Sequence, residues 1–397
     1  MGIELNNDQI YASYKFEHWF KTQDQQVFEI TGGAGTGKTT MILYCIERLG
    51  LSLDDVLFVS YMGKAVSQMI RNGLPAKTIH STCYTYDKEV KTDENGHMVI
   101  GENNKPFMVW VQHRKEKLDK KYKLIVVDEG YTIPELNALD LLKFGIPIVA
   151  LGDSNQLPPP FGKPFFLQHP DVALHQIMRQ AENNPIIYLA QRVLAHEELP
   201  IGVFGNSAVI KKENLTDFQL RNADVIITYT NALRGAVNKL FREQFLDIQQ
   251  LEYPHYGEKI ICKRNNWGKF IRNKGEIYLT NGLTGFVDYL DKRTYSKNSI
   301  VIDFRPDFSS TPFRNLKIDI PHLNRPLGTK VESEWIPPDC DVFEYAYALT
   351  TYACQGSQWD DVVLLREETY RENSDLFWQA LYSAITRAIK KVTIVNP

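Results

Sequence analysis

The sequence predicts an α/β protein with two parallel-sheet cores, and three observations support this prediction. Short apolar runs alternate with helical segments in the first half of the 397-residue chain. The same alternation returns near the C-terminus. A glycine-rich loop, ITGGAGTGKTT at 30–40, follows the first apolar run and opens a helix. Since almost every residue of these runs is apolar, we expect a doubly wound sheet with helices on both faces.

The expected elements can be placed from these runs. The first core should contain strands at 27–31, 56–61, 123–129 and 147–153 and a helix at 39–50. The second core should contain strands at 224–230, 361–365 and 391–395 and helices at 232–245 and 376–390. The second core carries no glycine-rich loop of the same pattern, so one nucleotide is expected to serve both cores.

Two stretches interrupt the α/β alternation. Residues 84–119 contain two alternating runs around the turn DENG, in which Asn95-Gly96 is a strong hairpin signal. Residues 254–340 contain short β-like runs separated by glycine and proline. We therefore expect an inserted hairpin in the first core and a small inserted β barrel in the second.

The composition narrows the class of protein. A net charge of −3 and a pI of about 6.3 exclude a generic basic nucleic-acid coat, so nucleic-acid contacts must come from local patches. Five scattered cysteines without a C-x-x-C pair favour reduced intracellular thiols over disulfides or a zinc site. The sequence shows no apolar run of about 18 residues and no secretory signal, so we expect a cytoplasmic protein without a membrane segment.

The glycine-rich loop predicts a nucleoside triphosphate site. Its pattern is G-x-x-x-x-G-K-[ST], and the strand before it and the helix after it are the context that this motif requires. Backbone N–H groups would bind the phosphates, Lys38 would meet the β- and γ-phosphates, and Thr39 would ligate Mg²⁺. The expected nucleotide contacts are Gly32, Gly33, Ala34, Gly35, Thr36, Gly37, Lys38, Thr39 and Thr40.

Asp128 and Glu129 end an apolar strand, and so lie at the carboxyl edge of the predicted sheet. We interpret Asp128 as a Mg²⁺ ligand and Glu129 as the base that orients and deprotonates the attacking water. Most acidic pairs are solvated surface charges, but the buried strand and the nearby phosphate loop favour the catalytic interpretation. Together the two motifs predict an NTPase without indicating the work that hydrolysis drives.

Three further motifs indicate that work. They are LGDSNQLPPP at 151–160, YALTTYACQGSQWDDVVL at 347–364, and LYSAITRA at 381–388, which is expected to place Arg387 on a helix. In this order they resemble the GDxxQLPP, QGSxxD and YxAxTRA motifs of superfamily 1 helicases. The strongest resemblance is to the RecD-like and Dda-like enzymes of the 5′→3′ branch, superfamily 1B, and the compact size resembles a phage type.

The resemblance covers nearly the whole chain and implies four structural parts. Two are RecA-like P-loop NTPase cores, and two are insertions within them. The implied parts are core 1A at 1–83 and 120–185, a hairpin wedge 1B at 84–119, core 2A at 186–253 and 341–397, and an SH3-like small β barrel 2B at 254–340.

The resemblance also assigns roles around the nucleotide. Gln9 looks like the glutamine that reads adenine, and Gly356 belongs to the nucleotide-facing QGS motif. Gln156 resembles the sensor that links the γ-phosphate to the nucleic-acid track. Arg179 and Arg387 resemble arginine fingers, a role that suits a planar guanidinium because it meets two phosphate oxygens.

The nucleic-acid contacts are implied in the same way. GKA at 63–65 matches the family's DNA-binding motif between a strand and a helix, and TIHS at 78–81 matches the next DNA-binding motif of the family. YTN at 229–231 matches the family's nucleic-acid track on the second core. The basic, aromatic-containing run at 263–274 suits backbone charge with base stacking, although a solvated barrel loop explains it equally well. The implied contacts are Lys64, Thr78, His80, Thr230, Asn231, Trp267, Thr350 and Gln355. Tyr352 and Ala353 replace the family's usual His-Lys, so one contact is lost or changed.

The implied function is ATP- and Mg²⁺-dependent 5′→3′ translocation on single-stranded DNA with duplex unwinding, in replication, recombination or repair. Its partners would be single-stranded DNA, single/double-strand junctions and replication or recombination proteins, and the chain would act as a monomer. One alternative is a DNA-stimulated ATPase that remodels or assembles a nucleoprotein complex without processive unwinding. Another is a P-loop ATPase or kinase of a small substrate, which would lack the QGS and TRA motifs. RNA remains open as the track.

Overall fold

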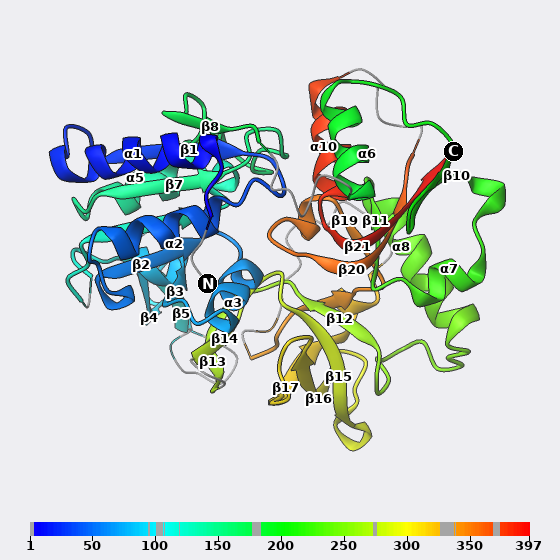
Figure 1. The fold of residues 1–397 in the computed structure, drawn as a ribbon. Helices are drawn as coiled ribbons and strands as arrows, with labels where there is room; N and C mark the ends of the chain where they lie inside the picture. Colours follow the sequence, from blue (N-terminus) through cyan, green and yellow to red (C-terminus); the bar gives the residue numbers. More distant parts are fainter. Residues whose placement is uncertain are drawn as a thin grey trace.

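The computed structural model describes residues 4–93, 96–100, 106, 108–118, 120–176, 184–272, 276–325, 337, 339–367 and 374–397. The description of residues 88, 108–110, 267 and 276 is limited to the backbone. Two α/β cores lie side by side with a β-rich part beneath the second core (Figure 1).

The first core is a parallel sheet with strand order β3-β2-β6-β7-β1-β8. Its strands are β1 Val27–Gly32, β2 Val56–Ser60, β3 Ala76–Thr78, β6 Leu124–Asp128, β7 Ile148–Gly152 and β8 Val172–Leu174. Its helices are α1 Asn7–Thr22, α2 Lys38–Arg48, α3 Gly63–Arg71, α4 Ile79–Cys83 and α5 Glu135–Leu142.

Helices cover both faces of this sheet, as the apolar strands predicted. Leu124 and Val126 of β6 pack in the hydrophobic cluster that contains side chains of α1, α2 and α3. Ile125 and Val127 point the other way, into the cluster that contains side chains of α4 and α5. Since successive strand residues alternate between the faces, all-apolar strands follow from helices on both sides.

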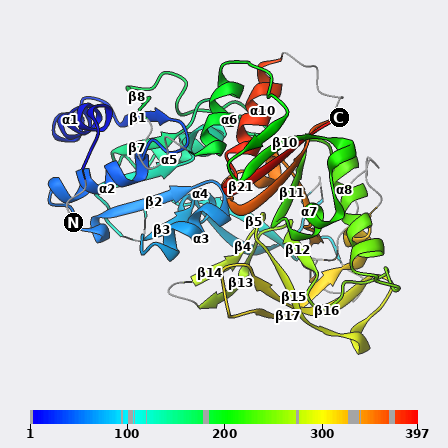
Figure 2. The same ribbon diagram turned by 45° about the vertical axis from the view of Figure 1, so that its right-hand side comes forward.

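The second core repeats the arrangement with strand order β19-β11-β20-β21-β10-β9, parallel except for the β9–β10 pair. Its strands are β9 Gly202–Phe204, β10 Ser207–Lys211, β11 Val225–Thr228, β19 Ala348–Thr350, β20 Trp359–Leu365 and β21 Ala388–Asn396. Its helices are α6 Pro185–Leu194, α7 Asp217–Asn222, α8 Asn231–Leu240 and α10 Asp375–Ile385. A π-helical turn, Phe241–Phe245, continues α8, and α6 lies beside α10 (Figures 1 and 2).

One predicted helix is too long. The expected helix at 376–390 ends at Ile385, and β21 begins at Ala388. The Thr386 hydroxyl donates to the carbonyls of Tyr382 and Ser383, and Trp359 N donates to the Arg387 carbonyl. The backbone therefore leaves the helix to pair with β20, and the prediction that Arg387 lies on a helix is wrong: Arg387 lies in the turn between α10 and β21.

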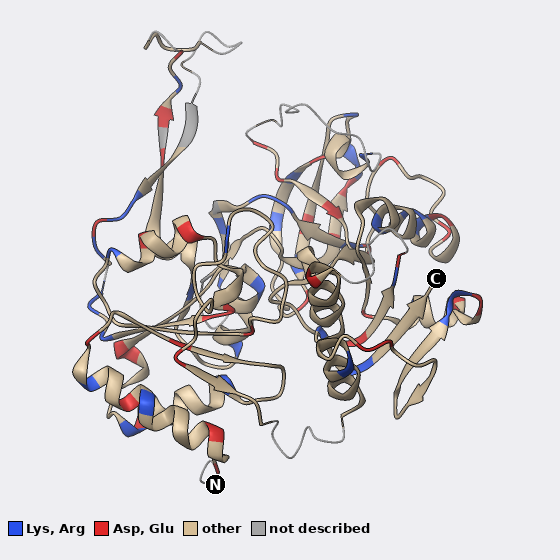
Figure 3. Ribbon diagram, turned by 90° about the horizontal axis from the view of Figure 1, so that it is seen from above, with Lys and Arg blue, Asp and Glu red and all other residues tan. Residues whose placement is uncertain are grey.

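Residues within 84–114 form an antiparallel pair, β4 Tyr84–Val90 and β5 Met108–Arg114. Figure 3 shows this hairpin extending away from the first core. Beyond the paired strands, Met98 and Ile100 expose 64% and 52% of their surface. Gly96 has a positive φ of 81°, as its place in the expected turn requires, while Asn95 lies outside the described residues.

The second interrupted stretch forms an antiparallel five-stranded sheet with order β17-β16-β15-β12-β18. Its strands are β12 Lys259–Cys262, β15 Thr284–Asp291, β16 Ser299–Pro306, β17 Phe313–Asp319 and β18 Phe343–Tyr345. A two-stranded ribbon of β13 Asn266–Arg272 and β14 Glu276–Leu279 and a short helix, α9 Ile320–Leu323, accompany it. β18 belongs to this sheet although the sequence places 341–397 in the second core, so the inserted part extends past residue 340.

Among the described residues, no helix is long and apolar enough to cross a membrane.

Candidate nucleotide site and nucleic-acid interface

The glycine-rich loop joins β1 to α2, and its conformation depends on glycine. Gly35 and Gly37 have positive φ values of 79° and 73°, which only glycine adopts without strain. The ammonium of Lys38 donates to the carbonyls of Gly32 and Gly33, the latter at 3.2 Å. The loop thus holds a cation beside backbone N–H groups at a helix N-terminus, which is a phosphate-binding arrangement.

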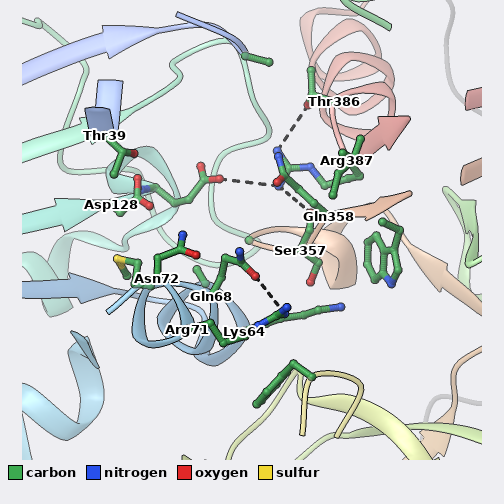
Figure 4. Close-up of a pocket in the computed structure, with 18 of the residues that line it drawn as sticks. Thr39, Lys64, Gln68, Arg71, Asn72, Asp128, Ser357, Gln358, Thr386 and Arg387 are labelled. Carbon is green, nitrogen blue, oxygen red and sulfur yellow. Dashed lines mark hydrogen bonds and ion pairs between the residues drawn. The ribbon is translucent and has the colours of Figure 1, made fainter. Parts of the chain in front are cut away.

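A cavity of about 990 Å³ opens from this loop into the space between the two cores. In Figure 4, Thr39 and Asp128 lie on one wall, and Ser357, Thr386 and Arg387 lie on the opposite wall. The predicted nucleotide residues that line the cavity are Gly33, Ala34, Gly35, Gly37, Lys38, Thr39, Thr40, Asp128, Glu129, Gln156, Gly356 and Arg387. Residues that are far apart in the sequence therefore converge on one space.

The acidic pair stands where β6 ends. Asp128 Oδ1 accepts a hydrogen bond from Glu129 N at 3.0 Å, and Glu129 adopts a left-handed φ of 54°. Burial and, to a smaller extent, the Glu129 charge raise the pKa of Asp128 to about 6, although Lys38 opposes both effects. A buried carboxylate with a raised pKa is one that a cation would stabilise.

The residues present fit Mg²⁺. The described residues contain no group of three or more His, Cys, Asp or Glu side chains that could hold a metal alone. Thr39 and Asp128 instead offer a hydroxyl and a carboxylate beside the phosphate loop. Mg²⁺ is usually bound through one or two carboxylates together with water and substrate phosphates, so this small oxygen set suits it.

Arg387 faces Glu129 across the cavity. Its Nη1 lies 3.8 Å from Glu129 Oε1, and the guanidinium also donates to the carbonyls of Ser357 at 3.3 Å and Ser383 at 3.1 Å. Only 4% of Arg387 is exposed. The second core therefore presents a fixed guanidinium to the Glu129 carboxylate of the first. Arg179, the other expected finger, lies outside the described residues.

Gln9 lies in α1 and is fully buried. Its side chain forms a capping box with Asn6, and its Nε2 donates to the carbonyl of Thr36 at 3.0 Å. Gln9 thus contacts the back of the phosphate loop, and its contact with adenine stays a prediction. Gln156 is 8% exposed and lines the cavity three residues after Asp153.

Lys64 points into the cleft between the cores. Its ammonium donates to Thr284 Oγ1 at 3.0 Å, lies 3.7 Å from Asp307 Oδ2, and sits 4.0 Å from the ring centroid of Trp359. Burial lowers the pKa of Lys64, against the opposing effect of Asp307. The structure therefore places Lys64 against the inserted sheet and the second core.

Thr78 and His80 lie at the start of α4. Thr78 is the N-cap of this helix and its Oγ1 accepts from Ser81 N at 3.1 Å. The His80 ring lies 5.3 Å from that of Tyr61 and 5.8 Å from that of Tyr84, and burial lowers the pKa of His80. The lowered pKa favours the neutral form of the His80 ring.

Thr230 and Asn231 begin α8, where sequence analysis missed a partner. Glu367 Oε2 accepts hydrogen bonds from Tyr229 N and Thr230 N, both at 2.8 Å, and the Thr230 hydroxyl also bonds to Glu367. Glu367 lies two residues after β20, and its position in the sequence gives no signal for this contact. The Thr230 groups expected to face a nucleic-acid phosphate are bonded to a carboxylate here.

Thr350 ends β19, and its hydroxyl accepts from Ala353 N at 3.4 Å. Gln355 is buried, and its Nε2 donates to the Leu157 carbonyl of the first core at 2.9 Å. Gly356 has a φ of 67°, and a side chain there would meet Met62, so glycine is required. For Trp267 the described part is the backbone of β13.

Two family models match the chain in separate regions. The AAA domain matches residues 17–162, which contain the phosphate loop and the acidic pair. The UvrD-like helicase C-terminal domain matches residues 345–395, which contain the QGS motif and Arg387. The two matches thus fall on the two walls of the cavity.

Curated relatives align over most of this chain but are longer. The ATP-dependent RecD2 DNA helicase of Deinococcus radiodurans is 26% identical over 90% of the chain and 45% of the relative. An uncharacterised protein of Methanocaldococcus jannaschii is 23% identical over 92% of the chain and 36% of the relative. The chain therefore spans less than half the length of these relatives.

Solved structures show the same fold. The Pif1 helicase from Bacteroides, in complex with ADP-AlF3 and single-stranded DNA, aligns with a TM-score of 0.54 and 17% identity, over 99% of this chain and 92% of that one. Pif1 from Candida albicans aligns with a TM-score of 0.52 and 15% identity, over 100% and 95%. The ordered motifs, the two family models and this fold together support the resemblance of the chain to the helicases of superfamily 1B.

Proposed function

We propose that the chain hydrolyses ATP to move 5′→3′ along single-stranded DNA and to separate duplex strands. The observation that supports this most directly is the cavity between the cores, with Lys38 and Glu129 on one wall and Arg387 on the other. A site divided between two cores links hydrolysis to their relative movement, which is what a translocating enzyme needs.

The residues around the cavity would share the chemistry. Lys38 neutralises phosphate charge, Glu129 orients and deprotonates water, and Arg387 stabilises charge that develops in the transition state. Thr39 and Asp128 would hold Mg²⁺, which supplies further charge neutralisation when bound. Gln9 is proposed to read adenine and Arg179 to act as a second finger.

The nucleic-acid track is proposed to cross both cores. Thr78 and His80 would contact it on the first core, and Asn231 and Thr350 on the second, with Trp267 stacking on a base. Thr230 would contact a phosphate only after releasing Glu367. Lys64 and Gln355 would act from the cleft, where their side chains lie.

The division into parts 1A, 1B, 2A and 2B remains part of the proposal. We propose that the β4–β5 hairpin is the wedge, because it extends from the first core and exposes Met98 and Ile100 beyond its paired strands. Apolar side chains inserted at base steps are a known means of unstacking a duplex. The β12–β18 sheet would form the SH3-like barrel.

DNA as the track is supported by relatives, and the 5′→3′ direction rests on the resemblance of the motifs to superfamily 1B. The Deinococcus radiodurans relative is named as a DNA helicase, and the Bacteroides Pif1 structure contains single-stranded DNA. Work in replication, recombination or repair would follow from strand separation.

The test is ATP hydrolysis by the parent with no nucleic acid, with single-stranded DNA and with single-stranded RNA, followed by strand separation of a tailed duplex. We expect single-stranded DNA to raise turnover by at least about tenfold, because closure around the track completes the site. Stimulation of ATP hydrolysis without strand separation would support a remodelling ATPase instead. Stimulation by RNA alone would indicate that the track is RNA and not DNA.

A further inference from the structure

A short segment of the first core is held by the second core. Residues 153–157 follow β7, yet Leu157 is fully buried in the hydrophobic cluster of the second core. Leu157 N donates to Ser383 Oγ at 2.8 Å, and the Leu157 carbonyl accepts from Gln355 Nε2 at 2.9 Å. Gln156, the proposed sensor, is therefore carried by a segment whose end is anchored across the cleft.

The hydroxyl of Tyr382 on α10 bonds both to the start of this segment and to the phosphate loop. Its hydroxyl donates to Asp153 Oδ2 at the start of the segment and accepts from Ala34 N of the phosphate loop at 3.3 Å. Tyr382 is 2% exposed, and a side chain added at Gly33 would lie 3.1 Å from its oxygen. One hydroxyl of the second core thus bridges the phosphate loop and the sensor segment of the first.

We infer that Tyr382 is a positioning residue whose hydroxyl makes the placement of the 153–157 segment, and so of Gln156, depend on nucleotide in the phosphate loop. This inference rests on the proposed function of the cavity as an ATP site. Tyr382 belongs to the LYSAITRA motif at 381–388, in which the sequence analysis assigned a role to Arg387 alone.

The physical argument concerns competition for one backbone N–H. Phosphates bound to the loop attract its N–H groups, Ala34 N among them. When Ala34 N turns toward a phosphate, the Tyr382 oxygen loses a donor and its bond to Asp153 readjusts. Asp153 is buried, and a buried carboxylate is costly without hydrogen-bond donors. The carboxylate therefore shifts together with the Tyr382 hydroxyl, and the 153–157 segment shifts with Asp153.

A purely structural role would need only the ring. Phenylalanine would fill the same space in α10, and the hydroxyl makes its two described bonds to the first core. Tyr382→Phe therefore removes the bridge and leaves the packing. Tyr347→Phe is the matched control, because Tyr347 is also buried in the second core and its hydroxyl accepts from Lys259 N at 3.3 Å.

The experiment is hydrogen exchange, read by mass spectrometry on peptides covering 32–40 and 153–157, for the parent and both variants with and without ADP and Mg²⁺. We expect ADP to protect 32–40 in all three proteins. Exchange of 153–157 should change by about threefold or more with ADP in the parent and in Tyr347→Phe, and hardly at all in Tyr382→Phe. Asp153→Asn, which keeps the side-chain size, should lose the same response.

The outcomes separate the inference from the proposed function. An unaltered ADP response of 153–157 in Tyr382→Phe overturns the inference, and so does a parent segment that ignores ADP. Loss of ADP protection at 32–40 in Tyr382→Phe alone would make Tyr382 a nucleotide-binding residue and overturn its positioning role. A parent whose hydrolysis ignores DNA contradicts the proposed function alone, because the exchange measurement contains no DNA.

Discussion

The ammonium of Lys38 lies over the phosphate loop and bonds to its carbonyls. Lys38→Ala removes a phosphate partner from a partly exposed loop without opening a buried cavity. We expect turnover to fall by at least about a hundredfold while the thermal midpoint stays near that of the parent. Phosphate release measures the first and a melting curve the second. Lys21→Ala, on the exposed last turn of α1, is the control, and turnover of Lys38→Ala within about tenfold of the parent would contradict the site.

Arg387 is buried on the opposite wall, where its guanidinium faces Glu129. Since a finger acts mainly in the transition state, Arg387→Lys should lower kcat by about 10³-fold and ADP affinity by less than about tenfold. Lysine keeps the charge but loses the planar fork, so the comparison isolates the geometry. Steady-state kinetics and ADP titration measure the two effects, and equal losses would indicate ground-state binding instead.

At the scale of elements, the local sequence pattern predicted the strands whose burial is itself local. β2 is buried at every position, so its apolar run VLFVS indicates a parallel strand without further knowledge. The positions of the glycine-rich loop and of Asp128-Glu129 could be predicted because both lie where such strands end. The end of α10 could not be predicted, because the helical pattern continues past Ile385 although the backbone there leaves the helix to pair with β20. The Tyr382–Asp153 and Glu367–Thr230 bonds join residues 229 and 137 positions apart, a separation that no local pattern encodes.

Glu344 on β18 joins the inserted sheet to α8. Its carboxylate bonds to Arg234 and lies 3.4 Å from Lys263 Nζ and 3.6 Å from His322 Nε2. Burial alone would raise the pKa of Glu344, but His322, Lys263 and Arg234 outweigh burial and hold that pKa far below its ordinary value of 4.5. A depressed folded-state pKa stabilises the fold above pH 4.5, and this contribution is lost as the pH falls toward the folded-state pKa.

Glu344→Gln should therefore destabilise the fold at pH 7, by about 3 kcal/mol, because it leaves the buried Arg234 guanidinium and the partly buried Lys263 ammonium without a carboxylate partner. The gap in melting temperature between the parent and Glu344→Gln should shrink as the pH falls below 4.5. Glu243→Gln, which removes an exposed helical pair with Lys239, is the control and should show almost no gap at either pH. A gap for Glu344→Gln that widens in acid would contradict the depressed pKa.

At the scale of the whole molecule, the inserted sheet is fastened to the second core. Arg242 forms two bonds to Glu258, Nε to Oε1 at 2.8 Å and Nη2 to Oε2 at 3.3 Å, and both residues are buried. The inserted part also contacts the first core, with contacts that include the Lys64 bond to Thr284 and the approach of Thr280 to Gly63 at the start of α3. We therefore expect the sheet to move with the second core, and Lys64 to exchange partners when the cleft opens.

The proposed wedge and direction are tested together. A variant shortened around residues 93–98 should keep its DNA-stimulated ATPase activity, because the hairpin lies outside the cavity between the cores. Its unwinding should fall, since opening a base-pair step costs roughly 1.4 kcal/mol and a motor without a wedge relies on thermal fraying. The measurement is strand separation of duplexes with a 5′ or a 3′ single-stranded tail, by the parent and the shortened protein at equal ATPase rates.

The parent should need the 5′ tail to separate strands. The comparison of the two tails tests the direction, and the comparison of the parent with the shortened protein tests the wedge. Preference for the 3′ tail would overturn the 5′→3′ direction while leaving the wedge intact. Undiminished unwinding by the shortened protein would overturn the wedge while leaving the direction intact. Replacing Met98 and Ile100 together with serine is the finer test, because it keeps the length of the hairpin and removes the exposed apolar surface. If that surface unstacks the junction, the serine variant should lose unwinding as the shortened one does.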